Sequence, residues 1–200
     1  GITQPKISWV LDADIQGFFD AISHEWLIKF LEHRIADQRL IRLIRKWLRA
    51  GVSEEGVWSK STVGTPQGAV ISPLLANIYL HYALDLWVDN WRKTSQGEVI
   101  IIRYCDDFVI GCQYRNKAEQ LLKDLRERLA KFGLELHQGK TRLIALVRFA
   151  AATREKRGDV KHETFDLLGF TNICAKTRQG GRFAIRRKTV AKRLRSSVNE

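Results

Sequence analysis

Residues 103–111 read RYCDDFVIG and place two adjacent carboxylates, Asp106 and Asp107, inside an otherwise apolar run. Both flanks are rich in β-branched and aromatic residues, a composition typical of strands. Unpaired carboxylates are costly to bury, so the pair is expected at a turn, at a bound cation, or at both. A plain hairpin tip is the alternative, because Asp tolerates turn conformations well.

The composition is typical of a globular domain with a core of its own. The 200 residues are 44% hydrophobic and 28% charged, and a chain of this length suits one domain. No run of about 18 apolar residues is present, so no membrane span is predicted. The first ten residues lack a signal-peptide pattern. Three cysteines without metal-ligand spacing indicate reduced thiols in a cytoplasm, and not a zinc site.

The charge balance favours a polyanionic partner. Lys and Arg number 34 against 22 Asp and Glu, which gives a net charge of +12. Such a surplus indicates nucleic acid before a membrane surface. Residues 171–200 carry many basic side chains and one acid, Glu200, and clustering of this kind suits phosphate binding. A solvated basic surface is the alternative.

The apolar periodicity predicts alternating strands and helices. Strands are expected over residues 7–15, on both sides of Asp106, over 134–147 with a turn at 137–139, and in a hairpin over 165–189. Helices are expected over 24–35, 37–50, 72–91 and 117–132, with N-caps at Ser23 and Ser72, a capping box of Asn116 and Glu119, and a stop at Gly133. Residues 51–70 are expected as a loop with short strands. Because regular βαβ units are missing, the pattern predicts an α+β fold with helices on one face of a sheet.

A third carboxylate, Asp14, also ends an apolar strand. If that strand lies beside the hairpin, Asp14 and Asp106 converge although they are far apart in the sequence. Neighbouring strand ends with three carboxylates make an oxygen-rich site of the kind that Mg²⁺ prefers. Two such ions about 4 Å apart activate an attacking hydroxyl and stabilise a leaving pyrophosphate. The combination with a basic chain predicts phosphoryl transfer on nucleic acid.

Five blocks in this order carry a family resemblance. They are LDADIQGFFDAI, GTPQGAVISPLLANIYLHYALD, RYCDDFVIG, LELHQGKTRLI and FDLLGF. Together they resemble the reverse transcriptase domain of bacterial group II intron-encoded proteins, which are reverse transcriptases and maturases. The likeness runs over essentially the whole chain. It implies a polymerase palm-like antiparallel sheet with helices packed on one face.

The resemblance implies a role for each matching residue of the metal site. Asp14 and Asp106 would be the principal Mg²⁺ ligands, with Asp107 beside them and the backbone carbonyl of Ile15 as a further ligand. Two Mg²⁺ ions are implied, with Mn²⁺ as a substitute. Lys140 matches a candidate general acid for the leaving pyrophosphate, and an ordinary exposed lysine is the alternative.

Other matches imply contacts with substrate. Phe19 falls where the family's aromatic residue screens the 2′-hydroxyl of an incoming nucleotide; core packing is its alternative role, because Phe18 is equally apolar. The loop under the template–nucleotide pair matches Gly64, Thr65, Pro66, Gln67 and Gly68, where a tight turn before a helix is the alternative. The hairpin that grips the primer end matches Leu168 and Gly169, where a strand bulge is the alternative.

The chain also departs from the family pattern. Gln16 stands where many relatives have Lys or Arg, and Cys105 replaces a common alanine. Only 13 residues precede Asp14, where the family has a fingers region. The resemblance therefore predicts a palm over residues 1–165, a primer-grip-like hairpin over 166–188 and the start of a thumb-like helix over 189–200, with fingers and thumb largely missing.

Two functions follow as hypotheses. The first is an RNA-directed DNA polymerase that copies an intron RNA template from a DNA primer with deoxynucleotides, in a bacterial cytoplasm and associated with RNA or the nucleoid. The second is an RNA-binding, maturase-type splicing cofactor without polymerase activity of its own. Three convergent acids favour the first, because RNA binding alone has no use for them. The sequence sets no oligomeric state.

Overall fold

A four-stranded antiparallel sheet forms the centre of the molecule. The computed structural model describes residues 7–49, 52–54, 57–59, 64–65, 70–146, 164–167, 170–176 and 183–189. In the central sheet the strand order is β4-β5-β1-β6, and each neighbouring pair is antiparallel. These strands are β1 (Trp9–Ala13), β4 (Val99–Tyr104), β5 (Asp107–Cys112) and β6 (Arg142–Ala145).

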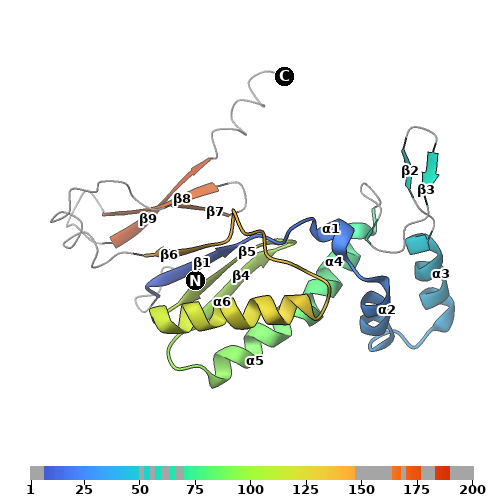
Figure 1. The fold of residues 1–200 in the computed structure, drawn as a ribbon, viewed down its shortest axis with the longest axis horizontal. Helices are drawn as coiled ribbons and strands as arrows, with labels where there is room; N and C mark the ends of the chain where they lie inside the picture. The colour runs from blue at the N-terminus through green and yellow to red at the C-terminus, as the bar shows by residue number, and fades with distance from the viewer. Residues whose placement is uncertain are drawn as a thin grey trace, which may run out of the picture.

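Helices cover one face of this sheet, and a second sheet lies toward the other (Figure 1). The helical segments are α1 (Phe18–Ala21), α2 (His24–Glu32), α3 (Gln38–Arg49), α4 (Ser72–Leu80), η1 (His81–Asp85), α5 (Leu86–Thr94) and α6 (Arg115–Ala130). The second sheet consists of β7 (Thr164–Leu167), β8 (Phe170–Lys176) and β9 (Phe183–Thr189). A short hairpin joins β2 (Val52–Glu54) to β3 (Val57–Ser59). The predicted α+β class, with an antiparallel sheet and helices on one face, is confirmed.

The two faces of the central sheet bury different residues because side chains alternate along a strand. On the helical face, Leu11 of β1 and Phe108 of β5 join the main core. On the opposite face, Val10 and Val109 join a smaller cluster with Phe165 of β7. Both central strands are therefore buried on two sides, which explains their nearly continuous apolar sequences.

Helix ends follow the sequence signals only in part. The Ser23 side chain accepts a hydrogen bond from the backbone N–H of Trp26, so the predicted N-cap of α2 is confirmed. The predicted capping box is wrong, because α6 begins at Arg115 and the Glu119 carboxylate pairs with the Arg115 guanidinium instead. Ser72 lies inside the first turn of α4 and Ile71 occupies the N-cap position, so the predicted cap at Ser72 is also wrong. Gly133 follows α6 with a φ of 72°, as expected for a residue that ends a helix.

The helix predicted over residues 72–91 extends to Thr94 but is not a regular α-helix. Its middle, η1, is π-helical, and the backbone N–H of Leu86 bonds to the carbonyl of His81, five residues back. A π-helical insertion of this kind is rare and is often found near functional sites.

The apolar periodicity of residues 37–50 predicts one apolar face made of Leu40, Leu43, Ile44, Trp47 and Leu48, and this prediction is partly wrong for α3. Ile41, Ile44 and Leu48 are buried, whereas Leu40, Leu43 and Trp47 of α3 remain about two-fifths exposed. Among the described elements α3 packs chiefly against α2. A helix covered by one neighbour buries one narrow stripe, so the rest of its apolar residues stay at the surface.

The C-terminal strands match the prediction in outline. Of the described residues 134–146 only β6 is a strand, and Leu136 makes a single bridge to Ile15. The predicted turn is present, with the His137 carbonyl accepting bonds from the Lys140 and Thr141 backbone N–H groups. The hairpin expected over 165–189 appears as β8 and β9, but its turn and residues 190–200 lie outside the described residues. No helix in the described part of the chain is long and apolar enough to span a membrane.

A buried tyrosine joins α4 to the end of α6. The Tyr79 hydroxyl is completely buried and donates a 2.6 Å hydrogen bond to the Phe132 carbonyl. We expect Tyr79→Phe to lower the free energy of unfolding by about 1–3 kcal/mol in urea titrations, because a buried acceptor loses its donor. Tyr82→Phe is the control, since the Tyr82 hydroxyl lies in an exposed contact with Arg34. An equal loss in both variants would contradict the assignment.

The same tyrosine predicts a pH dependence of stability. Burial raises the pKa of Tyr79 to about 12, from an ordinary value of 10.0. The folded protein therefore keeps a proton that the unfolded chain releases, so this stability is present below pH 10 and is lost as the pH rises toward 12. Urea titrations across this range should show a steeper decline in the unmodified protein than in Tyr79→Phe.

Candidate active site

Strand register brings Asp14 and Asp106 to the same edge of the central sheet. Ala13 at the end of β1 is paired with Phe108 near the start of β5. Asp14 follows β1 directly, and Asp106 lies in the two-residue turn that the Tyr104–Asp107 pair closes. The expected convergence of these two carboxylates is therefore a direct consequence of the β1–β5 pairing.

One hollow of about 250 Å³ lies at this edge. Its lining includes five of the residues predicted for the site, which are Asp14, Ile15, Phe19, Asp106 and Lys140. They come from the end of β1, from α1, from the β4–β5 turn and from the turn before β6. Three separate segments of the chain, residues 14–20, the β4–β5 turn and the turn before β6, thus contribute predicted residues to a single hollow.

Lys140 holds Asp14 by a direct ion pair across this hollow. Its ammonium Nζ lies 2.7 Å from Oδ2 of Asp14. The hydrogen bond and the charge of Asp14 raise the pKa of Lys140, and the charge of Asp106 raises it further. Both carboxylates therefore act on one cation, although the lysine side chain itself is mostly exposed.

The donor set of the hollow fits a divalent cation. Carboxylate oxygens are the ligands that Mg²⁺ prefers, and Asp14 and Asp106 border the same space as the backbone of Ile15. Asp107 begins β5 and does not line the hollow. Within the described residues no three His, Cys, Asp or Glu side chains gather into a metal-binding group. The structure thus brings together two of the three predicted carboxylates.

The two adjacent phenylalanines of α1 have different surroundings. Phe18 is almost fully buried in the main core, whereas Phe19 is half-buried, and both residues line the hollow. The ring centroids are 5.4 Å apart. Phe19 packs against the core and also borders the hollow, so the two roles considered for it from the sequence are compatible.

The start of the predicted template loop is fixed to α1 and to the segment after it. The backbone N–H of Gly64 donates to the Ile22 carbonyl, and that of Thr65 donates to the Phe19 carbonyl, both at 2.8 Å. The ring Nε2–H of His24 donates to the Gly64 carbonyl at 2.6 Å. This anchoring links the loop directly to the segment that carries Phe19.

The rest of the predicted substrate contacts lie outside the described residues. They are the loop residues Pro66, Gln67 and Gly68 and the primer-grip residues Leu168 and Gly169.

Among the lining residues without a predicted role, two carry titratable side chains. Asp20 of α1 borders the hollow, and so does His137, whose backbone N–H donates to the Asp14 carbonyl at 2.8 Å. The sequence signal for His137 was its place three residues before Lys140, in the turn that returns the chain toward Asp14. No such sequence signal was present for Asp20, which lies two residues after Phe18.

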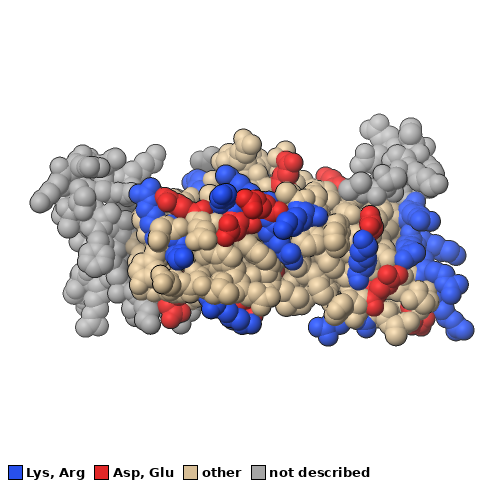
Figure 2. All heavy atoms as spheres, turned by 60° about the horizontal axis from the view of Figure 1, so that its bottom comes forward, with Lys and Arg blue, Asp and Glu red and all other residues tan. Residues whose placement is uncertain are grey.

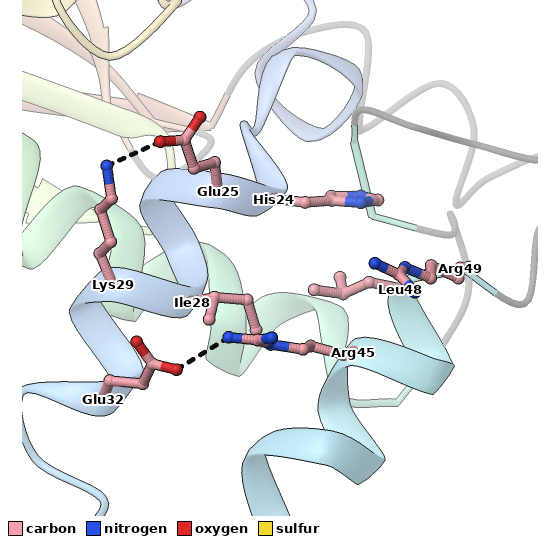
Figure 3. Close-up of a pocket in the computed structure, with 8 residues that line it drawn as sticks. All are labelled: His24, Glu25, Ile28, Lys29, Glu32, Arg45, Leu48 and Arg49. Carbon is pink, nitrogen blue, oxygen red and sulfur yellow. Dashed lines mark hydrogen bonds and ion pairs between the residues drawn. The ribbon is translucent and has the colours of Figure 1, made fainter.

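A second and larger hollow, of about 380 Å³, lies between α2 and α3 (Figure 3). Its acids are paired with its own cations, Glu25 with Lys29 and Glu32 with Arg45. Each of these carboxylates is neutralised by a neighbouring cation, and the two do not converge on a common point. We therefore interpret this hollow as a surface groove between two helices and not as an active site. The hollow at Asp14 and Asp106 is the candidate active site.

Comparison with known proteins identifies the family. Residues 2–172 match the family model described as reverse transcriptase (RNA-dependent DNA polymerase). The chain belongs to the reverse transcriptase family. The central sheet and the candidate site both lie within the matched residues, so the resemblance read from the five blocks is confirmed for the family.

Relatives of this reverse transcriptase domain include group II intron-encoded proteins. The Lactococcus lactis group II intron-encoded protein LtrA is 48% identical over 80 residues, 40% of this chain and 13% of LtrA. Protein YkfC of Escherichia coli is 34% identical over 128 residues, 51% of this chain and 34% of YkfC. These matches span from about a tenth to a third of the length of the relatives.

A solved structure shares the fold of this reverse transcriptase domain. Apo telomerase from Candida tropicalis, truncated from the C-terminal domain, superposes with a TM-score of 0.67 at 14% identity. The match covers 94% of this chain and 37% of the telomerase chain. At this identity the likeness establishes the fold alone.

The loop anchor predicts a strict requirement for glycine at position 64. Gly64 has a φ of 87°, and a Cβ there would lie 3.0 Å from the backbone of Phe19 and Asp20. We expect Gly64→Ala to lower the melting temperature, because both the strained φ and the clash oppose a side chain. Gly139→Ala is the matched control, since its Cβ would make only ordinary contacts. Unchanged melting of Gly64→Ala would contradict this view of the loop.

The Lys140–Asp14 pair predicts a second pH effect. A raised lysine pKa contributes stability below the unfolded pKa of about 10.5, and this contribution is lost as the pH rises further. We expect Lys140→Ala to lower the free energy of unfolding by no more than about 1 kcal/mol at pH 8, because the pair is exposed. The difference from the unmodified protein should shrink as the pH rises above the ordinary lysine value of 10.5 and Lys140 loses its proton. A difference that persists there would assign the loss to packing.

Proposed function

We propose that this domain is the palm of an RNA-directed DNA polymerase that transfers a nucleotide from a deoxynucleoside triphosphate to the 3′-hydroxyl of a DNA primer. The observation that carries the proposal is the convergence of Asp14 and Asp106, from neighbouring strands, on one hollow that Phe19 and Lys140 also border. The template would be intron RNA, in keeping with the group II intron-encoded relatives.

The carboxylates would hold Mg²⁺ or Mn²⁺ at this hollow. Asp14 and Asp106 would be the side-chain ligands, the Ile15 carbonyl would add a backbone ligand, and Asp107 would support the site from β5. Two bound ions would activate the primer hydroxyl and neutralise charge on the leaving pyrophosphate. Support comes from the oxygen-rich lining and from the single ammonium on which both carboxylates act.

Lys140 would act as the proton donor of the site. Its ammonium lies at the rim of the hollow, against Asp14. Because its pKa is raised, Lys140 keeps its proton throughout the physiological pH range. A protonated lysine beside a leaving phosphate neutralises developing charge and supplies a proton.

Phe19 and the loop that begins at Gly64 would shape the nucleotide site. Phe19 forms an apolar wall of the hollow and is suited to screening the sugar 2′-position. The hydrogen bond from Thr65 to the Phe19 carbonyl fixes the loop against this wall. Gln67 and the primer-grip pair Leu168–Gly169 complete the proposed substrate contacts, and the predicted division into palm, primer-grip hairpin and thumb-like helix remains part of this proposal.

The charge distribution supports nucleic acid as the partner. Helix α3 carries five basic side chains and no acid, and Figure 2 shows basic residues gathered at the end of the molecule where α3 lies. These five are Arg39, Arg42, Arg45, Lys46 and Arg49. A basic surface away from the hollow is also what an RNA-binding splicing cofactor needs, so that function is the second candidate. Binding through such a surface should weaken steeply with salt.

Primer extension distinguishes the two candidates. We expect the chain to extend a labelled DNA primer on an RNA template with Mg²⁺ and deoxynucleotides. Asp14→Asn and Asp106→Asn should each reduce the rate by about 100-fold or more, because each removes a carboxylate charge needed for the metal. Glu127→Gln, on the exposed surface of α6, removes the same charge elsewhere and should leave the rate unchanged.

RNA binding is measured on the same samples, so that an absence of primer extension can be interpreted. If no extension occurs and salt-sensitive RNA binding is equal in all four proteins, the polymerase proposal fails for this chain and the splicing-cofactor function is favoured. If extension occurs but survives both Asp substitutions, the hollow is not the active site.

A further inference from the structure

The turn that carries Asp106 has an unfavourable backbone conformation. Cys105 is the one described residue other than glycine with a positive φ, at 53°. Two-residue hairpin turns favour a positive φ at their first position, which is usually occupied by glycine, asparagine or aspartate. A side chain at this φ is disfavoured, so the turn depends on contacts from outside the hairpin to hold its shape.

One arginine makes the contact that fixes this turn. Arg103 of β4 donates from Nη1 to the Cys105 carbonyl at 2.8 Å and to Oδ1 of Asn77 at 2.8 Å. Its Nε and Nη2 donate to the two carboxylate oxygens of Asp85 at 2.7 and 2.6 Å. The Arg103 side chain is only 13% exposed. The guanidinium is therefore held on one side by the bidentate pair with Asp85 and donates a hydrogen bond to the turn on the other side.

The π-helical segment explains how two helical residues reach the same arginine. Asn77 and Asp85 are eight positions apart, and in a regular α-helix eight residues correspond to a rotation of about 80° beyond two full turns. The extra residue that η1 accommodates makes this interval equivalent to about seven α-helical steps, which brings both side chains to one face. That face is turned toward Arg103. Ile101, two positions before Arg103 on β4 and so on the same side of the strand, also packs against the helices.

We propose that Arg103, oriented by Asp85 and Asn77, is a positioning residue that sets the place of the Asp106 carboxylate in the active site. The inference rests on the proposed polymerase function for its effect on rate. Arg103 does not line the hollow. It acts through the carbonyl of Cys105, the residue directly before Asp106.

The chemistry of the side chain makes arginine specific for this place. A planar guanidinium directs parallel N–H groups at one carboxylate and further N–H groups at two other acceptors at the same time. Lysine keeps the charge but has no fixed fork, so it cannot satisfy Asp85, Asn77 and the Cys105 carbonyl together. Arg103→Lys therefore removes geometry while it preserves charge.

A second arginine supplies a matched control. Arg128 of α6 is also half-buried and donates to the carbonyls of Ala83 and Tyr82, in the same π-helical segment. It makes no contact with the β4–β5 turn among the described hydrogen bonds. Arg128→Lys thus tests the same substitution on the same segment without the link to Asp106.

The test compares the two variants by primer extension and by thiol labelling. We expect Arg103→Lys to lower kcat by about 100-fold, since a small displacement of a catalytic group has an effect of this size, while primer–template affinity stays unchanged. Site-resolved alkylation of Cys105 should be at least about threefold faster, because the turn opens more often. Arg128→Lys should leave both quantities near those of the unmodified protein, even if its melting temperature falls as much.

The outcomes test the positioning role of Arg103 and the polymerase function separately. Equal kcat and equal Cys105 alkylation in the two variants would overturn the positioning role of Arg103. If the unmodified chain does not extend primers, the polymerase proposal fails, yet the alkylation rates still decide whether Arg103 holds the turn. If Arg103→Lys weakens primer–template affinity and leaves kcat unchanged, Arg103 is a binding residue and the positioning role is wrong.

Discussion

The pairing of β1 with β5 is the constraint on which the rest of this domain depends. It joins residues about a hundred positions apart in the chain and fixes which side of each strand meets the helices. Because the register is set by apolar side chains on both faces, a slip of one residue would turn Leu11 and Phe108 away from the core. The same register places Asp14 beside the turn that carries Asp106. Core packing and the geometry of the candidate site are thus specified together.

The site brings together two like charges, which would repel each other without a neighbouring cation. Two carboxylates border one hollow, and the ammonium of Lys140 neutralises part of their charge. The turn beneath them contains a residue with a positive φ, which is an energetic cost on the order of 1–3 kcal/mol. The Arg103–Asp85 pair lies below this turn on the helical side, and the helices that hold it are in turn packed on the sheet. The free energy of core packing therefore offsets the cost of the positive φ at Cys105 and of the two neighbouring carboxylates at the edge of the sheet where we propose the active site.

Much of this arrangement was predictable from the sequence, for reasons that particular residues illustrate. Asp14 and Asp106 follow strongly apolar strands, and the five ordered blocks placed the chain in the reverse transcriptase family before any coordinates. The π-helical segment was not predictable, because its residues have ordinary helical propensity and the contacts that hold it are tertiary, from Arg103 to Asp85 and from Arg128 to the Tyr82 and Ala83 carbonyls. The exposed side of α3 was also missed, since apolar periodicity does not tell which neighbours are present. Asp107 matched the family motif, yet it does not line the hollow.

Cleavage by iron tests most directly the central claim that Asp14 and Asp106 jointly hold a divalent cation. Fe²⁺ with ascorbate and peroxide cuts a polypeptide backbone close to the bound ion, and the fragments can be mapped by mass spectrometry. The account predicts cuts next to residues 14 and 106 in the same sample, suppressed by excess Mg²⁺ and absent in Asp14→Asn. Cuts confined to other acidic positions, such as Asp37 or Asp89, or unaffected by Asp14→Asn, would contradict it.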